Sequence, residues 1–376
     1  MATKHWYVDS ENGDVFGTND GESKGSAIST IQDLLDNATP SSDTNQINII
    51  KRDTAYTLPG GGLDISRWPN TTTSNTIFRG CTYDNEPNDL ASANGAAPYA
   101  TLPKIDGADS GPLVDGTYDY VHFCDLHIAD MSGMVFMSRY GSFVNCVLSG
   151  WANQLYTNGY SFFIGNHIFD CADKFEFYIG DKVVGNFYED ATGDGFTTRN
   201  RDAFFLGNRI IVADGSSNYG IKLPNYNSIA MNNSIIADPD GSKQGTGLYA
   251  YHASQIIANN LVQGFSGTGG IGIIIAGVVY TSYMVNHNAV YNCSTNYVNC
   301  DENDTEQVYW LGNNVNANGV LFRGGTLSYA NRDTYFSPTP EVKRSSCFPT
   351  GFYRDRGAVE HKDPVLSSPI KQSLGY

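Results

Sequence analysis

Short apolar segments separated by turn residues recur along the middle of the chain, and neighbouring segments repeat the same pattern. The stretches SFFIGNHIFD (161–170) and DKVVGNFYED (181–190) each contain apolar residues, Gly-Asn, further apolar residues and an acid. Equivalent motifs recur about every 24 residues from residue 145 to residue 313. Each unit offers three short alternating segments and lacks the 3.6-residue period of a helix. Because such a unit buries its apolar face only against its neighbours, the pattern predicts a solenoid of stacked parallel strands.

The asparagine of each motif is expected to point inward at a turn of this solenoid. Neighbouring strands lie about 4.8 Å apart, so equivalent side chains of successive turns form columns. A buried amide in such a column can hydrogen-bond to the amides above and below it, which predicts an asparagine ladder. The predicted ladder residues are Asn145, Asn166, Asn186, Asn208, Asn233 and Asn259.

The chain divides into three predicted segments. Residues 1–60 contain a first strand, a glycine-rich turn and a short helix, AISTIQDLLDNA (27–38), with Ser26 or Ser29 as the expected N-cap. Residues 61–330 form the solenoid. Residues 331–376 form a closing segment and a polar tail, which we expect to be a free tail or a partner-binding arm.

The repeats and two further stretches resemble the right-handed parallel β-helix proteins of the pectin-lyase-like class. The N-terminal strand, turn and helix look like the entry of such proteins, and DRGAVEH (355–361) is similar to the Asp-x-Gly-Ala-x-Glu signature that closes many of them. The resemblance implies an all-β fold, a single-stranded right-handed parallel β-helix with a short N-terminal capping helix. Bacteriophage spike and appendage proteins and polysaccharide-active enzymes share this fold.

Composition narrows the classes of partner. The formal net charge of −16 argues against nucleic acid and against an anionic membrane as the main partner. The most apolar run, GGIGIIIAGVVY (269–280), is too short and too rich in glycine to span a bilayer, and no secretory signal is visible. Seven cysteines without CxxC spacing indicate free thiols in a protein that folds in a reducing cytosol.

The candidate binding surface comes from strand alternation. The segments that follow each long loop send their second and fourth residues outward, which predicts two outward columns of aromatic and charged side chains. Aromatic rings interleaved with charged groups suit sugar rings, although packing within the sheet or a subunit contact would also explain them. The predicted glycan-binding residues are Tyr156, Tyr178, Tyr249, Tyr251 and His252.

Three residues of the same columns are candidates for catalysis, namely Glu176, Arg199 and Lys222. Glycoside hydrolysis needs two carboxyl groups, and Glu176 is the only acid in the columns, with Asp181 and Asp202 at nearby strand ends. Polysaccharide β-elimination needs a base and a group that neutralises the uronate carboxylate, for which Arg199 and Lys222 are suitable types. The sequence lacks the polygalacturonase motifs and the Arg-x-Pro-x-x-Arg of pectate lyases, so the resemblance carries over no catalytic residue.

No metal site or cofactor is expected. His127, Cys146 and His167 fall on three successive turns, but the outer two are about 10 Å apart, too far for one zinc ion. Acids recur after the third strand of each turn, where they suit turns better than the alternative, a calcium site. These acids are Asp130, Asp170, Asp190, Asp214 and Asp238.

Two functions fit these observations. The first is a structural or adhesive protein of a bacteriophage particle, such as a spike, an appendage or a head decoration. It would be a homotrimer that assembles with other virion proteins in the host cytoplasm and lies on the virion surface, with a face that binds glycans. The alternative is an extracellular polysaccharide lyase or glycoside hydrolase, a depolymerase.

Overall fold

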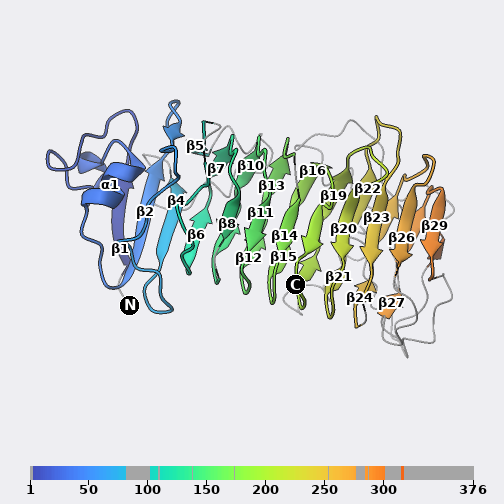
Figure 1. The fold of residues 1–376 in the computed structure, drawn as a ribbon. Coiled ribbons are helices and arrows are strands. Elements are labelled where there is room, and N and C mark those ends of the chain that lie inside the picture. Colours follow the sequence, from blue (N-terminus) through green and yellow to red (C-terminus); the bar gives the residue numbers. More distant parts are fainter. Residues whose placement is uncertain are drawn as a thin grey trace, which may run out of the picture.

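The computed structural model describes residues 3–81, 102–108, 111–137, 139–172, 174–252, 254–276, 284–286, 288–300 and 315–316. Within these residues the chain winds into a parallel β-helix of three sheets, and from β6 to β29 each turn contributes one strand to each sheet. Figure 1 shows the strands side by side along the solenoid axis, from β1 at one end to β29 at the other. The predicted fold is therefore confirmed. The predicted closing segment DRGAVEH and the tail lie outside the described residues.

Sheet I contains eleven parallel strands that follow one another in chain order. Its inward residues include Phe78, Phe123 and Phe143, whose rings stack with centroids 5.0 and 5.2 Å apart. Such columns bury large apolar area because each ring covers the face of the next. The strands are β1 (Thr3–Val8), β2 (Thr44–Ile50), β4 (Thr76–Cys81), β6 (Val121–Cys124), β9 (Ser142–Val144), β12 (Phe162–Ile164), β15 (Lys182–Val184), β18 (Phe204–Leu206), β21 (Ile229–Met231), β24 (Ile256–Ala258) and β27 (Met284–Asn286).

Sheet II also has eleven parallel strands in chain order. Its inward residues, such as Leu148, Ile168 and Tyr188, join the same apolar core as those of sheet I. The strands are β3 (Tyr56–Thr57), β5 (Lys104–Asp106), β7 (His127–Ala129), β10 (Val147–Ser149), β13 (His167–Phe169), β16 (Phe187–Ala191), β19 (Arg209–Val212), β22 (Ser234–Ala237), β25 (Leu261–Gln263), β28 (Ala289–Tyr291) and β30 (Val315–Asn316).

Sheet III has eight parallel strands and completes the triangular section of the solenoid. Phe175, Phe177 and Phe196 point from it into the core, where Phe196 contacts the ring of Phe205 from sheet I. The strands are β8 (Val135–Met137), β11 (Leu155–Thr157), β14 (Phe175–Phe177), β17 (Phe196–Thr198), β20 (Tyr219–Leu223), β23 (Thr246–Ala250), β26 (Ile271–Ile275) and β29 (Thr295–Val298).

A corner of two residues links each strand of sheet I to the next strand of sheet II from β6–β7 to β24–β25. The second residue of this corner forms the asparagine ladder. Asn166 is typical, because its backbone N–H and its Nδ2 both donate to Asn186 Oδ1, at 2.9 and 3.0 Å, and its Nδ2 also donates to the Phe143 carbonyl. The same contacts recur from turn to turn, so the buried side-chain amides of the ladder find partners in the neighbouring turns. The ladder amides are Asn166, Asn186, Asn208, Asn233, Asn260 and Asn288.

Two predicted ladder residues were wrong by one position. The ladder places belong to Cys146, whose N–H donates to Asn166 Oδ1, and to Asn260, which bonds to Asn288. Asn145 and Asn259 instead occupy the first residue of the corner, with left-handed φ values of 53° and 57°. Asparagine tolerates this conformation better than most residues, so it suits either place in the corner and the motif alone does not fix the register.

The N-terminal segment continues the solenoid. β1 and β2 pair in parallel with each other, and β2 pairs with β4, so residues 3–50 extend sheet I. Between them, the short 3₁₀ helix η1 (Lys24–Ser26) precedes α1 (Ile31–Asn37), which lies at the end of the solenoid in Figure 1. The N-cap of α1 is Thr30, rather than Ser26 or Ser29, because its side chain accepts a hydrogen bond from the Asp33 N–H. α1 buries its apolar side against the core and caps it.

No helix among the described residues is long and apolar enough to span a bilayer. None of the six cysteines in the described part of the chain forms a disulfide, and Cys81, Cys146 and Cys171 are buried. Burial raises the pKa of the Cys171 thiol to about 12, so this group stays protonated and unreactive at neutral pH.

Candidate functional site

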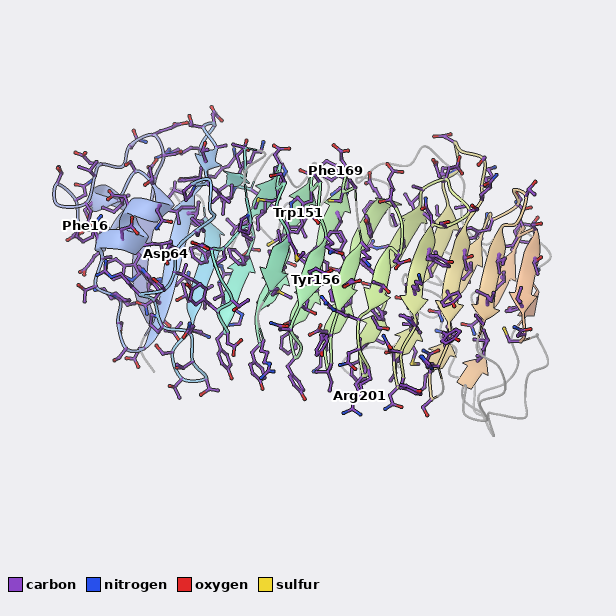
Figure 2. All side chains as sticks on the ribbon, viewed as in Figure 1. Phe16, Asp64, Trp151, Tyr156, Phe169 and Arg201 are labelled. Atoms are coloured by element: carbon purple, nitrogen blue, oxygen red, sulfur yellow. The ribbon has the colours of Figure 1, made fainter. Side chains whose placement is uncertain are left out.

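The outer face of sheet III carries the column that strand alternation predicts. Tyr156 pairs with Glu176, Glu176 with Thr197, Thr197 with Lys222, and Lys222 with Tyr249. These residues come from β11, β14, β17, β20 and β23, and Figure 2 labels Tyr156 among them. The parallel register stacks the side chains along the solenoid axis at a spacing of about 4.8 Å.

Glu176 lies between two cations. Its Oε1 is 2.6 Å from Lys174 Nζ, and its Oε2 is 3.7 Å from Arg199 Nη1. Partial burial opposes the charge of Lys174, but the hydrogen bond to Glu176 and the carboxylates of Glu176 and Asp194 outweigh it and raise the pKa of Lys174. Lys174 therefore acts as a fixed cation at neutral pH. The Glu176 side chain is only 12% exposed, whereas that of Arg199 is 49% exposed and accessible to a ligand.

Lys222 forms a second ion pair two strands after Glu176, on β20. Its Nζ is 2.6 Å from Asp194 Oδ1, and it also lies 4.6 Å from the ring centre of Tyr219 and 5.8 Å from that of Tyr249. The two tyrosine rings meet edge to face, with centroids 5.4 Å apart. Cation–π contacts of this kind hold the ammonium over the aromatic faces.

Arg199 contacts both the carboxylate of Glu176 and the aromatic ring of Tyr156. The guanidinium of Arg199 lies 4.3 Å from the ring centre of Tyr156, and Gln154 Nε2 donates to the Tyr156 hydroxyl. The resulting charged strip carries three cations and two carboxylates, one net positive charge on a chain of net charge −16. The charged strip consists of Tyr156, Lys174, Glu176, Asp194, Arg199, Tyr219, Lys222 and Tyr249.

The structure does not bring every predicted site residue into the charged strip. Tyr251 and His252 form a cluster with Tyr226, in which His252 stacks on Tyr226 at 4.4 Å and meets Tyr251 edge to face at 4.8 Å. Among the described residues, no hydrogen bond or ring contact joins the Tyr178 side chain to the charged strip.

Lys174, Asp194, Tyr219 and Tyr226 were missed from the sequence. Lys174 lies two residues before Glu176, so the alternation that selected Glu176 also selects it when extended into the preceding loop. Tyr219 lies at the start of β20, outside the five-residue segments that were aligned. Asp194 and Tyr226 lie in turns, where no periodic signal exists.

Asp181 is a buried acid beneath the Tyr178 end of β14. Thr157 Oγ1 donates to its Oδ2, and the Ser161 N–H donates to its Oδ1 at 2.7 Å. Burial raises the pKa of Asp181 to about 6, and these hydrogen bonds only partly offset the effect. The Asp181 carboxyl group is therefore neutral in weakly acidic solution, but it is buried in the protein interior and does not belong to the charged strip.

This burial predicts a pH-dependent loss of stability that Asp181→Asn removes. Unfolded Asp181 ionises near pH 4, whereas the folded group keeps its proton up to about pH 6. Between these values the folded state binds more protons, so the contribution of Asp181 to stability falls as pH rises and is constant above pH 6. A pKa difference of about 2 corresponds to about 3 kcal/mol. Urea unfolding at pH 4, 5, 6 and 7 measures the free energy of unfolding of wild type and of Asp181→Asn. Between pH 4 and pH 7 wild type should lose about this much more than the variant. If the two proteins show the same pH dependence, the raised pKa of Asp181 is wrong.

The histidines of sheet II make local pairs. His127 Nε2 lies 2.8 Å from Ser149 Oγ, and His167 Nε2 lies 2.9 Å from Glu189 Oε1, while Cys146 points into the core. Asp170 and Asp190 have left-handed φ values of 52° and 54°, as expected of turn residues. The described residues contain no group of three or more histidine, cysteine, aspartate or glutamate side chains able to hold a metal ion.

Comparison with protein families and with curated proteins finds no match. Among solved structures, the chain is similar to a GH136 lacto-N-biosidase from Eubacterium ramulus, with a TM-score of 0.45, 10% identity and coverage of 78% of this chain. It spans 65% of the length of that protein. A PL6 family polysaccharide lyase from Pseudopedobacter saltans aligns with a TM-score of 0.33 and 13% identity, over 78% of this chain and 94% of the lyase. Both neighbours are β-helix proteins, the structural class to which this fold belongs.

Proposed function

We propose that this protein binds an acidic polysaccharide, one that carries carboxylate groups. The polysaccharide would lie along the outer face of sheet III and be cleaved at the charged strip. The observation that carries the proposal is the exposed Arg199 guanidinium, held over Tyr156 and beside Glu176 in a locally positive strip of an acidic protein. The proposal takes up the depolymerase alternative, for which the sequence offered candidates of the right type.

Binding is supported by the combination of groups on a flat face. The rings of Tyr156, Tyr219 and Tyr249 offer apolar surfaces on which sugar rings stack. Arginine binds a carboxylate through two parallel hydrogen bonds, so Arg199 suits a uronate. The rest of the chain repels an acidic polymer, which would favour binding where the local charge is positive.

The ion pairs favour elimination over hydrolysis. Hydrolysis needs a carboxyl group that donates a proton to the glycosidic oxygen. Both carboxylates of the strip are held by cations, Glu176 by Lys174 and Arg199, and Asp194 by Lys222. In β-elimination a base removes the proton beside the uronate carboxylate, the electron pair forms a carbon–carbon double bond, and the glycosidic oxygen leaves and takes up a proton. Arg199 would neutralise the carboxylate, and Tyr156 and Lys222 are the groups that would carry protons.

The test is a panel of polysaccharides. The full chain is incubated with uronic-acid polymers, namely alginate, polygalacturonate and hyaluronan, and with neutral glucans, while unsaturated products are followed by ultraviolet absorbance and new reducing ends by a colour reaction. We expect unsaturated products from at least one uronic-acid polymer and none from the glucans. Reducing ends without unsaturation would replace elimination by hydrolysis. Binding without any product would leave an adhesive role.

The bacteriophage role has no specific support in the charged strip or elsewhere in the described part of the chain. The homotrimer, the virion partners and the virion location stay predictions, as does the alternative extracellular location. Detection of the protein in purified particles and measurement of its mass in solution would test them.

A further inference from the structure

A polar hollow lies beside the N-terminal end of the charged strip, at the corner between sheets III and I. It has a volume of about 400 Å³, within the size range of small-molecule sites. Its lining comes from the loop before β4, the loop before β6 and the corners that follow β8 and β11. The lining residues are Asn70, Thr117, Asp119, Arg139 and Asn158.

The polar groups of the hollow are available to a ligand. The backbone N–H of Arg139 donates to Asp119 Oδ1 at 3.0 Å, which fixes the two corners relative to each other. The Arg139 guanidinium itself is exposed and makes no hydrogen bond or ion pair with any described residue. The side chains of Asn70, Thr117 and Asn158 likewise have no protein partner within the described ranges. The hollow therefore offers donors and acceptors together with one cation, Arg139, whose guanidinium forms no ion pair with a described residue, and one carboxylate, Asp119, which accepts from the Arg139 N–H.

A stack of three tyrosines follows the hollow along the same corner. The Tyr120 and Tyr140 rings are 4.7 Å apart and nearly parallel, and the Tyr140 and Tyr160 rings are 5.5 Å apart. Their φ values of 58°, 61° and 56° lie in the left-handed region, which costs a residue with a side chain about 1–2 kcal/mol. Tyr140 and Tyr160 remain 38% and 47% exposed. The equivalent residues of later turns, Gly180, Asp202 and Asn227, have left-handed φ values as well, so the corner imposes this conformation. At Tyr140 it places aromatic surface next to Arg139.

The hollow and the charged strip lie along one line. Asn158 lies in the second outward column of sheet III, in the turn before Tyr178, and Arg199 follows Tyr178 by one further turn. Arg139 belongs to the turn before Asn158, so three turns separate the two arginines. At about 4.8 Å per turn, this separation along the solenoid axis is about 14 Å.

We propose that the hollow is a second saccharide subsite, in which Arg139 binds a carboxylate of the same polysaccharide chain whose cleaved unit lies at Arg199. The subsite rests on the proposed function and specifies it further: the bound polymer runs along the solenoid axis and presents carboxylates to both arginines. Asn70, Thr117 and Asn158 bind sugar hydroxyls, and the tyrosine stack begins at the residues that directly follow Asp119 and Arg139.

The test compares short and long oligomers. Isothermal titration is carried out with alginate, polygalacturonate and hyaluronan oligomers of two or three sugars and of about ten sugars, using wild type, Arg139→Ala, Arg199→Ala and the control Arg201→Ala. We expect Arg139→Ala to weaken binding of the long oligomers about tenfold or more and to leave the short ones, which fit at the charged strip alone, within a factor of two. Arg199→Ala should weaken both. Thermal unfolding should be unchanged in Arg139→Ala because the side chain is exposed.

The outcomes separate the two proposals. If wild type binds and Arg199→Ala loses binding, but Arg139→Ala equals wild type at both lengths, the second subsite is wrong and the proposed function stands. Equal weakening of short and long oligomers by Arg139→Ala also overturns a separate subsite. If no oligomer binds to wild type, the proposed function fails and the subsite fails with it.

Discussion

Replacing Asn186 with alanine is expected to lower the free energy of unfolding by about 3–5 kcal/mol. Asn186 Nδ2 donates to the Phe163 carbonyl and to Asn208 Oδ1, and its Oδ1 accepts from the N–H and the Nδ2 of Asn166. All of these groups are buried, so the variant leaves several polar atoms without a partner or water. Urea unfolding followed by far-ultraviolet circular dichroism measures the loss.

The control for this variant is Asn158→Ala, the same chemical change in a neighbouring turn of the solenoid. The Asn158 side chain lines the polar hollow and has no protein partner among the described residues, so its removal should change the free energy of unfolding by less than about 0.5 kcal/mol. If both variants lose a similar amount of unfolding free energy, the ladder position of Asn186 gives no more stability than the position of Asn158 in the lining of the polar hollow.

Arg199→Ala is expected to reduce the rate of polysaccharide cleavage by about 10²–10³, the usual cost of removing a group that stabilises charge in a transition state. The guanidinium is the exposed cation of the charged strip, and it contacts both Tyr156 and Glu176. Its loss leaves the uronate carboxylate without its neutralising partner and raises the barrier to proton removal. Initial rates of formation of unsaturated products, measured on the polymer that wild type cleaves, test the expectation.

Arg201→Ala is the matched control for cleavage. Arg201 lies two residues away, pairs with Asp202 at 3.6 Å, and its side chain is 58% exposed. Figure 2 shows it at the edge of the molecule, away from Tyr156. Its removal should leave the rate within a factor of two of wild type. Equal losses in the two variants would indicate a general effect of surface charge, and an unchanged rate in Arg199→Ala would remove this residue from the mechanism.

The fold could be predicted from the sequence because the repeat reports a physical constraint. Each turn must place an apolar face inward and a turn at each corner, so segments such as SFFIGNHIF and DKVVGNFY carry the same alternation. The exact corner register could not be predicted at Asn145 and Asn259. Asparagine fits both the left-handed first place and the inward second place of the corner, and only the surrounding strand pairing decides between them.

The candidate site could be predicted only where it follows strand alternation. Tyr156, Glu176, Lys222 and Tyr249 form one column because parallel strands in register place equivalent residues above one another. Asp194 was not predicted, because a turn side chain reaches Lys222 through a loop conformation that has no sequence period. The contacts of the His252 ring with Tyr226 and Tyr251 also depend on the conformation of the corners, which strand alternation does not predict.

The two-residue corner has a consequence for how this fold changes in length. Successive ladder amides are 20 residues apart at Asn166 and Asn186 but 28 apart at Asn260 and Asn288, and the corner between sheets I and II absorbs none of the difference. The extra residues therefore lengthen the sheet III strand, from three residues in β14 to five in β26, and the other two corners, which border the outer face of sheet III. Duplication of a twenty-residue turn would add one strand to each sheet and lengthen that face by about 4.8 Å. Under the proposed function, the number of turns, and not the identity of the contact residues, would set the length of polysaccharide that the protein spans.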